Sequence, residues 1–227
     1  IDFIRAYKAL ESINLYYLIL AIISSFLLFF FWNLRLRSSL SVICKTGRIF
    51  NFLIFISGVF FNTITPGAST GGEPVRAYFL SKKYHEPKSK FLGVILADKL
   101  MHLSVLFVFF AFSLIFLLTF FSIPFQLELL IIITLSIVIS IFLLFLIFNI
   151  KLNNIYHYFL KLLYKLKYLN SRFNKFHLFK KYFGIKLRSV WKYFKSVFNN
   201  KKILYKGIIF SILVWGFDFL TSYLLFL

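Results

Sequence analysis

The long apolar runs of this chain constrain its fold more than any other feature. Several of them reach the roughly twenty residues that a helix needs to cross a bilayer. The chain is 60% hydrophobic and only 15% charged, which exceeds the apolar share of ordinary soluble domains. We therefore predict an all-α, polytopic helical membrane protein in which residues 1–227 form a single integral membrane domain.

Five hydrophobic segments predict five helices, and they cover residues 13–32, 48–65, 91–121, 125–150 and 207–227. Pro124 marks a short turn, so the third and fourth segments are expected to form an antiparallel hairpin. The first residue is not Met, and Leu227 ends the chain inside an apolar run. We expect the sequence to be a fragment of a longer protein.

The net charge of +20 indicates an anionic partner, either nucleic acid or a membrane surface. Its distribution favours the membrane. Residues 151–206 carry 15 basic residues and no acidic one, and they lie between two apolar segments. This arrangement is typical of a cytoplasmic loop near anionic lipid headgroups. We predict that residues 151–206 are cytoplasmic, that the protein resides in the cell (plasma) membrane, and that it has no nucleic-acid partner.

Helical periodicity within this basic segment predicts two amphipathic helices. The first begins near Ile155 and ends near Leu166, and the second covers 185–198, with Gly184 separating them. Apolar residues of the second recur on one face: Leu187, Val190, Trp191, Phe194 and Val197. Two placements fit this pattern, an amphipathic helix in the membrane interface or a cytosolic helical hairpin with its lysines in solvent. Both give a scaffold rather than a reaction centre.

The basic residues also predict the topology. Residues 33–48 carry four and no acid, and residues 66–90 carry five against two acids, so both look cytoplasmic. A segment 48–65 that crossed the bilayer fully would place them on opposite faces. Either residues 66–90 form a polar re-entrant loop broken at Pro66-Gly67, or the positive-inside rule fails for one loop. Irregular backbone at membrane depth must be sheltered by protein or by a water-filled cavity, so re-entrance implies a cavity.

Ionisable groups inside membrane spans cost roughly 2.5 to 3.5 kcal/mol each on insertion scales, so each needs a reason. Glu73 and Arg76 share one face if residues 72–81 are helical. Gly71 and Gly72 stand at the start of this helix and allow close approach to its N-terminal N–H groups, which suit a phosphate. The guanidinium of Arg76 could hold that phosphate through several donors.

Two further places carry such groups. Asp98, Lys99 and His102 stand near the start of the third segment, where Asp98 and His102 are one helical turn apart. Asp218 lies midway through the last segment, near Trp215. Cations from other helices could meet Asp98, Asp218 and Glu73 across the bundle. Each of these charges can equally be a satisfied structural pair.

The chain lacks the motifs of soluble enzymes. It has no GxSxG, P-loop or GxGxxG sequence. Its one cysteine, Cys44, excludes an internal disulfide, and the four histidines are scattered. We therefore expect no metal site and no cofactor. An enzyme with its whole site in residues 66–102 is conceivable, since Glu73 could serve as a base, but nothing supplies a nucleophile, so a transporter-like protein is favoured over an enzyme.

A family resemblance follows from the residues between Asn62 and Tyr78, which read N-x-x-x-P-G-x-x-x-G-G-E-P-x-R-A-Y, and from VILADKLMHL at 94–103. Together they resemble the lysylphosphatidylglycerol synthase transmembrane region, or flippase-like integral membrane family. Residues matching its first motif are Asn62, Pro66, Gly72, Glu73 and Arg76. Asp98 and Lys99 stand for the acid and base of its second motif, while His102 replaces an Asp. The SILVWGFDF run at 211–219 is similar to the family's Trp-containing helix.

The resemblance implies a lipid-handling role. Bacterial members join this region to a soluble aminoacyl-transferase domain that lysinylates phosphatidylglycerol, and the membrane part is credited with moving the product between leaflets. By resemblance the chain is expected to bind and translocate an anionic lipid, either a phospholipid or a polyprenyl-phosphate-linked headgroup. The alternatives are a membrane subunit or enzyme of lipid modification, working with a partner aminoacyl- or glycosyl-transferase, and a structural anchor whose basic loop recruits cytosolic proteins.

Overall fold

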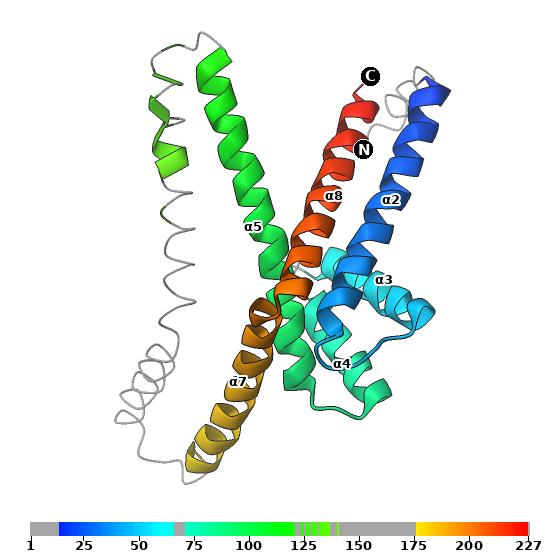
Figure 1. Ribbon diagram of the computed structural model, residues 1–227, viewed down its shortest axis with the longest axis vertical. Coiled ribbons are helices and arrows are strands. Elements are labelled where there is room, and N and C mark those ends of the chain that lie inside the picture. The colour runs from blue at the N-terminus through cyan, green and yellow to red at the C-terminus, as the bar shows by residue number, and fades with distance from the viewer. Residues whose placement is uncertain are drawn as a thin grey trace. The chain divides into compact units, whose positions relative to one another are not determined.

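The computed structural model describes residues 14–65, 71–120 and 176–226, with short stretches between 124 and 140. Every regular element in these described residues is an α-helix. The chain divides into two compact parts, residues 1–102 with 186–227, and residues 103–185. The first part contains α2, α3, α4 and α8 together with the beginning of α5 and the end of α7 (Figure 1).

Six helices are described. Their bounds are Leu15–Leu40 (α2), Arg48–Ile64 (α3), Gly72–Tyr84 (α4), Lys88–Phe120 (α5), Phe176–Asn199 (α7) and Lys201–Leu225 (α8). Among the described residues, α2, α5 and α8 are long and apolar enough to cross a membrane, whereas α3 is apolar but shorter. These observations confirm the predicted all-α membrane architecture. Most of the predicted fourth segment, 125–150, lies outside the described residues.

The helices α2 and α8 pack side by side and run in opposite directions (Figure 1). Phe31 stacks on Phe217 with ring centroids 5.6 Å apart, and the Ser24 hydroxyl donates to the Phe217 carbonyl. Their other faces expose large apolar side chains, such as Phe26 at 66% and Ile212 at 45%. Such exposed apolar faces suit contact with lipid rather than water.

The first helix is longer than the sequence predicted. It does not end near Trp32 but continues to Leu40, so residues 33–40 do not belong to a loop. Asn33 and Arg35 are buried in this last part of α2. Counting Arg35 as a cytoplasmic loop cation was therefore wrong, because other helices cover it and supply partners for its charge.

Helices α3 and α4 form a hairpin with two tight ends. At one end the Gly47 N–H donates to the Tyr84 hydroxyl at 3.3 Å. At the other end the Gly72 N–H donates to Asn62 Oδ1 at 2.6 Å. The backbones approach so closely there that a Cβ on Gly72 would clash with the Gly58 carbonyl. The chain thus leaves this hairpin beside the point where it entered.

This hairpin bears on the topology question. Because Gly47 and Tyr84 are adjacent, residues 41–47 and 85–87 lie at one end of the hairpin. Both loops can therefore occupy one face of a membrane without breaking the positive-inside rule. Pro66-Gly67, where the sequence predicted the break, lies outside the described residues.

The end of α7 packs on protein rather than standing alone. Phe194 and Val197, from the predicted apolar face, are buried in the same core as Phe91 and Leu80. Gly93 on α5 lies directly against the Val190 backbone. The helix also runs through Gly184 without interruption, so the predicted break at this glycine was wrong. The predicted helix from Ile155 to Leu166 lies outside the described residues.

A buried amide joins α2 to α3. Asn51 is fully buried, and its Nδ2 donates to Asn33 Oδ1 at 2.6 Å and to the Asn33 carbonyl at 3.3 Å. The Thr46 hydroxyl donates to Asn51 Oδ1. Because both ends of the Asn51 amide are used, this contact fixes the direction in which α3 leaves α2.

We predict that Asn51→Ala destabilises the fold by about 1 to 3 kcal/mol, since it leaves Asn33 and Thr46 buried without these partners. The midpoint of thermal unfolding in detergent should fall clearly. Asn199→Ala, at an exposed position, serves as the matched control and should change the midpoint little. Equal midpoints for both variants would contradict the role given to Asn51.

Candidate functional site

The central charge pair of the bundle joins Arg35 of α2 to Asp98 of α5. The side chains are 1% and 5% exposed, and Arg35 Nη2 lies 3.1 Å from Asp98 Oδ2. Arg35 Nε also donates to both carboxylate oxygens, at 3.2 and 3.3 Å. Two hydroxyls complete the network: Ser39 donates to Asp98 at 2.9 Å, and Ser211 on α8 accepts from Arg35 at 3.4 Å. One buried cation thus ties three helices together.

A second pair joins α4 to α5. Lys99 Nζ lies 2.7 Å from Glu73 Oε1. The Glu73 side chain is 7% exposed, whereas the Lys99 side chain is 31% exposed. Glu73 Oε2 is buried and has no hydrogen-bond partner among the described residues. This pair is therefore the more accessible of the two, and it is incompletely satisfied.

Arg76 is buried on α4 without an ion pair in the described part of the chain. It is 4% exposed, and its Nη2 donates to the Phe55 carbonyl at 3.2 Å. Its guanidinium carbon lies 5.3 Å from the centre of the Phe55 ring. Its Nε has no hydrogen-bond partner among the described residues. The charges of Asp98 and Glu73 act on it electrostatically, but neither carboxylate touches it.

The hairpin glycines make room for this arginine. Gly58 on α3 faces the Arg76 guanidinium so closely that a Cβ there would overlap it. Asn62 caps the first N–H of α4, at Gly72, and a Cβ on Gly71 would press on the Thr65 side chain. Asn62, Gly71 and Gly72 thus shape the end of the hairpin. Pro66, the remaining predicted site residue of this stretch, lies outside the described residues.

His102 belongs to an aromatic stack. Its ring lies between Trp32 and Trp215, with centroids 5.6 and 4.6 Å away. Trp215 Nε1 donates to the His102 carbonyl at 3.1 Å, and Trp215 stacks in turn on Phe219. The Nδ1 atom of His102 is buried without a partner among the described residues. The structure joins His102 to Trp215, and it shows no hydrogen bond from His102 to Asp98.

Asp218 stands apart from these charges. It is half-buried on α8 and forms no ion pair within the described residues. Its carbonyl accepts from the Ser222 hydroxyl, as is usual one turn along a helix. The expected cation from another helix is therefore present for Asp98 and Glu73, and the described residues supply none for Asp218.

The structure adds residues that the sequence reading did not select: Trp32, Arg35, Ser39 and Ser211. A signal existed in the sequence, because Ser24, Leu28, Arg35 and Ser39 recur at spacings of four and seven on one face of a helix. The described residues contain no group of three His, Cys, Asp or Glu side chains placed to hold a metal ion.

The four buried charges of the described residues balance in number, Arg35 and Arg76 against Asp98 and Glu73, but Glu73 pairs with the partly exposed Lys99. Asp98 pairs with Arg35, which leaves Arg76 without an ion pair in the described residues. A positive charge with an unused donor in an apolar environment is costly unless an anion approaches it. This arrangement is suited to binding an anionic group. The described residues place no nucleophile beside a general base here.

We predict that Asp98→Asn costs about 3 to 5 kcal/mol of stability, because Arg35 would then be buried without its counter-charge. Asp218→Asn removes a carboxylate without an ion pair in the described residues and should cost much less. The double variant Arg35→Met/Asp98→Leu should be more stable than Asp98→Asn. Thermal unfolding in detergent measures all three, and equal losses for both single variants would contradict the pairing.

Comparisons with known proteins bear on this site. The family described as "Lysylphosphatidylglycerol synthase TM region" matches residues 1–227. A UPF0104 membrane protein of Pyrococcus horikoshii is 28% identical over 98% of this chain and 67% of its own length. Another, from Methanocaldococcus jannaschii, is 32% identical over 45% of this chain.

The match to the Methanocaldococcus jannaschii protein spans only 31% of that protein's length. No solved structure matches this chain. The family match nevertheless covers every residue, including both charge pairs and the hairpin. This chain is a multi-pass membrane protein that belongs to the lysylphosphatidylglycerol synthase transmembrane-region family.

Proposed function

We propose that this chain binds the anionic headgroup of a membrane lipid at Arg76, Glu73 and Lys99, and that it moves this lipid between the leaflets. The observation that carries the proposal is Arg76, a buried guanidinium with an unused N–H and no ion pair in the described residues. A phosphate would supply the missing negative charge and accept from the guanidinium.

Access to these charges is supported by Lys99. Its side chain is 31% exposed, while the side chain of its partner Glu73 is 7% exposed. Lys99 is therefore partly accessible at the surface and also contacts the buried carboxylate of Glu73. A phosphate that displaced the Glu73 carboxylate from Lys99 would gain a second cation. The barrier to lipid movement is desolvation of the headgroup, and buried partners of opposite charge would lower it.

The α3–α4 hairpin would then be re-entrant. Two observations support this: the ends of the hairpin are adjacent, since the Gly47 N–H donates to the Tyr84 hydroxyl, and α3 is shorter than the three candidate spans. In this proposal the hairpin dips into the membrane, with α2 against α3 and α5 against α4. The basic loops and residues 151–206 face the cytoplasm of a cell whose plasma membrane holds the protein.

We predict that Arg76→Ala abolishes lipid movement. In proteoliposomes, the flip rate of a fluorescent phosphatidylglycerol should fall to that of protein-free liposomes. Arg48→Ala, which removes an exposed arginine, should keep the original rate. Lys99→Gln should slow movement as well, and it provides a check if Arg76→Ala folds poorly. Unchanged rates in both Arg76→Ala and Lys99→Gln would refute the proposed site.

Re-entrance can be tested through Cys44, the only cysteine of the chain. We predict that Cys44 and a Lys88→Cys replacement in a Cys44→Ser background react with an impermeant maleimide from the same side of sealed vesicles. Reaction from opposite sides would mean that residues 48–84 cross the membrane.

The rate of that labelling should depend on pH in a defined direction. Burial and, to a lesser degree, the charge of Glu86 raise the pKa of the Cys44 thiol. A smaller fraction of the thiol is then present as the reactive thiolate at neutral pH. Labelling should therefore be slow at neutral pH and should accelerate as the pH rises. Glu86→Gln should lower this pKa and speed the reaction at neutral pH.

A further inference from the structure

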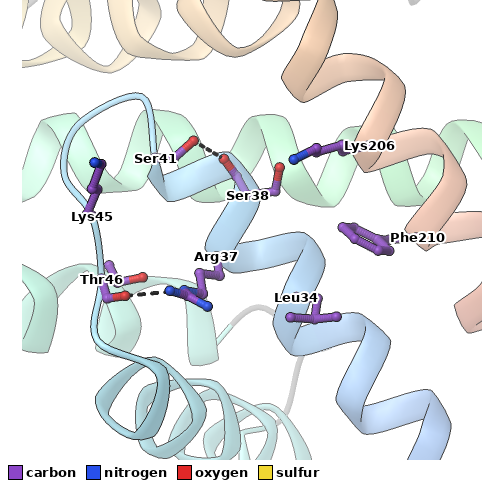
Figure 2. Close-up of a pocket in the computed structure, with 8 residues that line it drawn as sticks. All are labelled: Leu34, Arg37, Ser38, Ser41, Lys45, Thr46, Lys206 and Phe210. Carbon is purple, nitrogen blue, oxygen red and sulfur yellow. Dashed lines mark hydrogen bonds between the residues drawn. The ribbon is translucent and has the colours of Figure 1, made fainter.

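A groove of about 320 Å³ lies where the C-terminal end of α2 meets the N-terminal end of α8 (Figure 2). Three cations line it, namely Arg37 from α2, Lys45 from the following loop, and Lys206 from α8. No carboxylate is among the described residues that line it. In Figure 2 the Lys206 side chain reaches towards Ser38 across the groove.

Hydrogen-bond donors accompany these charges. The Arg37 Nε donates to the Thr46 carbonyl at 3.2 Å, which holds the guanidinium in place and leaves its terminal amino groups for another acceptor. Three hydroxyls also line the groove. Those of Thr46 and Ser41 already donate, to Asn51 Oδ1 and to the Ser38 carbonyl, so among the described residues here the Ser38 hydroxyl is the one left to donate. Phosphate oxygens accept hydrogen bonds from guanidinium and hydroxyl groups.

Neutralisation of a helix dipole does not explain all three cations. Arg37 stands in the last turn of α2, where a cation is favourable. Lys206, however, belongs to α8, whose first turn already carries Lys201 and Lys202 and no acid. Cations near a helix N-terminus are unfavourable. The groove therefore has a positive potential that an anion would relieve.

One wall of the groove is apolar. Leu34 and Phe210 line it beside the cations. One turn before Leu34, Phe30 is 45% exposed, and Ile209 next to Phe210 is 37% exposed. The charged groove thus continues into the apolar outer faces of α2 and α8. A lipid with a charged headgroup and apolar tails can contact both the cationic groove and the apolar helix faces, whereas a free phosphate contacts only the groove.

We propose that this groove binds the phosphate of an anionic phospholipid headgroup, with the acyl chains lying along α2 and α8. This site is distinct from the one at Arg76, because none of the Arg76, Glu73 or Lys99 side chains lines it. Arg37 and the buried Arg35 are two positions apart on α2, so they face different sides of the helix. Binding in the groove can therefore be measured independently of lipid movement.

The test is a titration of the full chain in detergent with short-chain phosphatidylglycerol, followed by tryptophan fluorescence or calorimetry. Lys45→Gln/Lys206→Gln should weaken binding by about tenfold or more, because two contacts to the anionic headgroup are lost. A triple variant that adds Arg37→Gln should weaken it further. Arg48→Gln/Lys82→Gln removes two exposed cations elsewhere and should bind as the original does.

Separate arms distinguish the source of the phosphate. Inorganic phosphate and glycerol phosphate should compete only at concentrations far above those of the lipid. If they bind as tightly as phosphatidylglycerol, the groove is a site for soluble phosphates and the lipid assignment is wrong. Equal affinity of the groove variant and its charge-matched control would overturn the site itself. Arg76→Ala should retain groove binding, so failure of the proposed transport and failure of this site give different results.

Discussion

The fold depends on how buried charges are neutralised in an apolar environment. A buried guanidinium is tolerated only where a counter-charge and further acceptors surround it, and Arg35 meets that condition through Asp98 and Ser211. This network fixes α2, α5 and α8 relative to one another within the first part of the chain. Ser39 binds the second side of the same carboxylate. Neither side chain of this pair has a buried polar atom without a hydrogen-bond partner, which distinguishes it from the charges at the hairpin.

The charges at the hairpin, one ion pair and one unpaired arginine in the described residues, differ from Arg35 and Asp98. Lys99 and Glu73 form a short ion pair, yet one carboxylate oxygen of Glu73 is buried without a partner among the described residues. Arg76 has the Phe55 carbonyl and ring as its neighbours instead of a carboxylate. Buried polar atoms without hydrogen-bond partners cost stability. Because Glu73 and Arg76 both carry such atoms and lie on the same hairpin, a binding role is favoured for them. A wholly structural pair would be expected to resemble Arg35 and Asp98.

Much of this arrangement could be predicted from local sequence. Apolar length predicted the long helices, and Gly71 and Gly72 before Arg76 predicted the helix start that the structure shows at Gly72. The apolar face of 185–198 was also predicted, although α5 rather than lipid covers part of it.

Contacts between distant segments could not be predicted in this way. Arg35 was assigned to a loop because the positive-inside rule counts charges without knowing which of them are buried. The His102 stack requires Trp32 and Trp215 to meet from two other helices. The basic groove likewise needs Lys206 beside Arg37, residues that nothing local relates.

The central claim is that Arg76 holds an anionic lipid headgroup. Native mass spectrometry of the protein purified from its membrane, in original and Arg76→Ala forms, tests this claim most directly. We expect an anionic phospholipid or polyprenyl phosphate to remain bound to the original protein, with one equivalent lost in the variant. Identical bound lipids in both forms, or no anionic lipid on either, would contradict it.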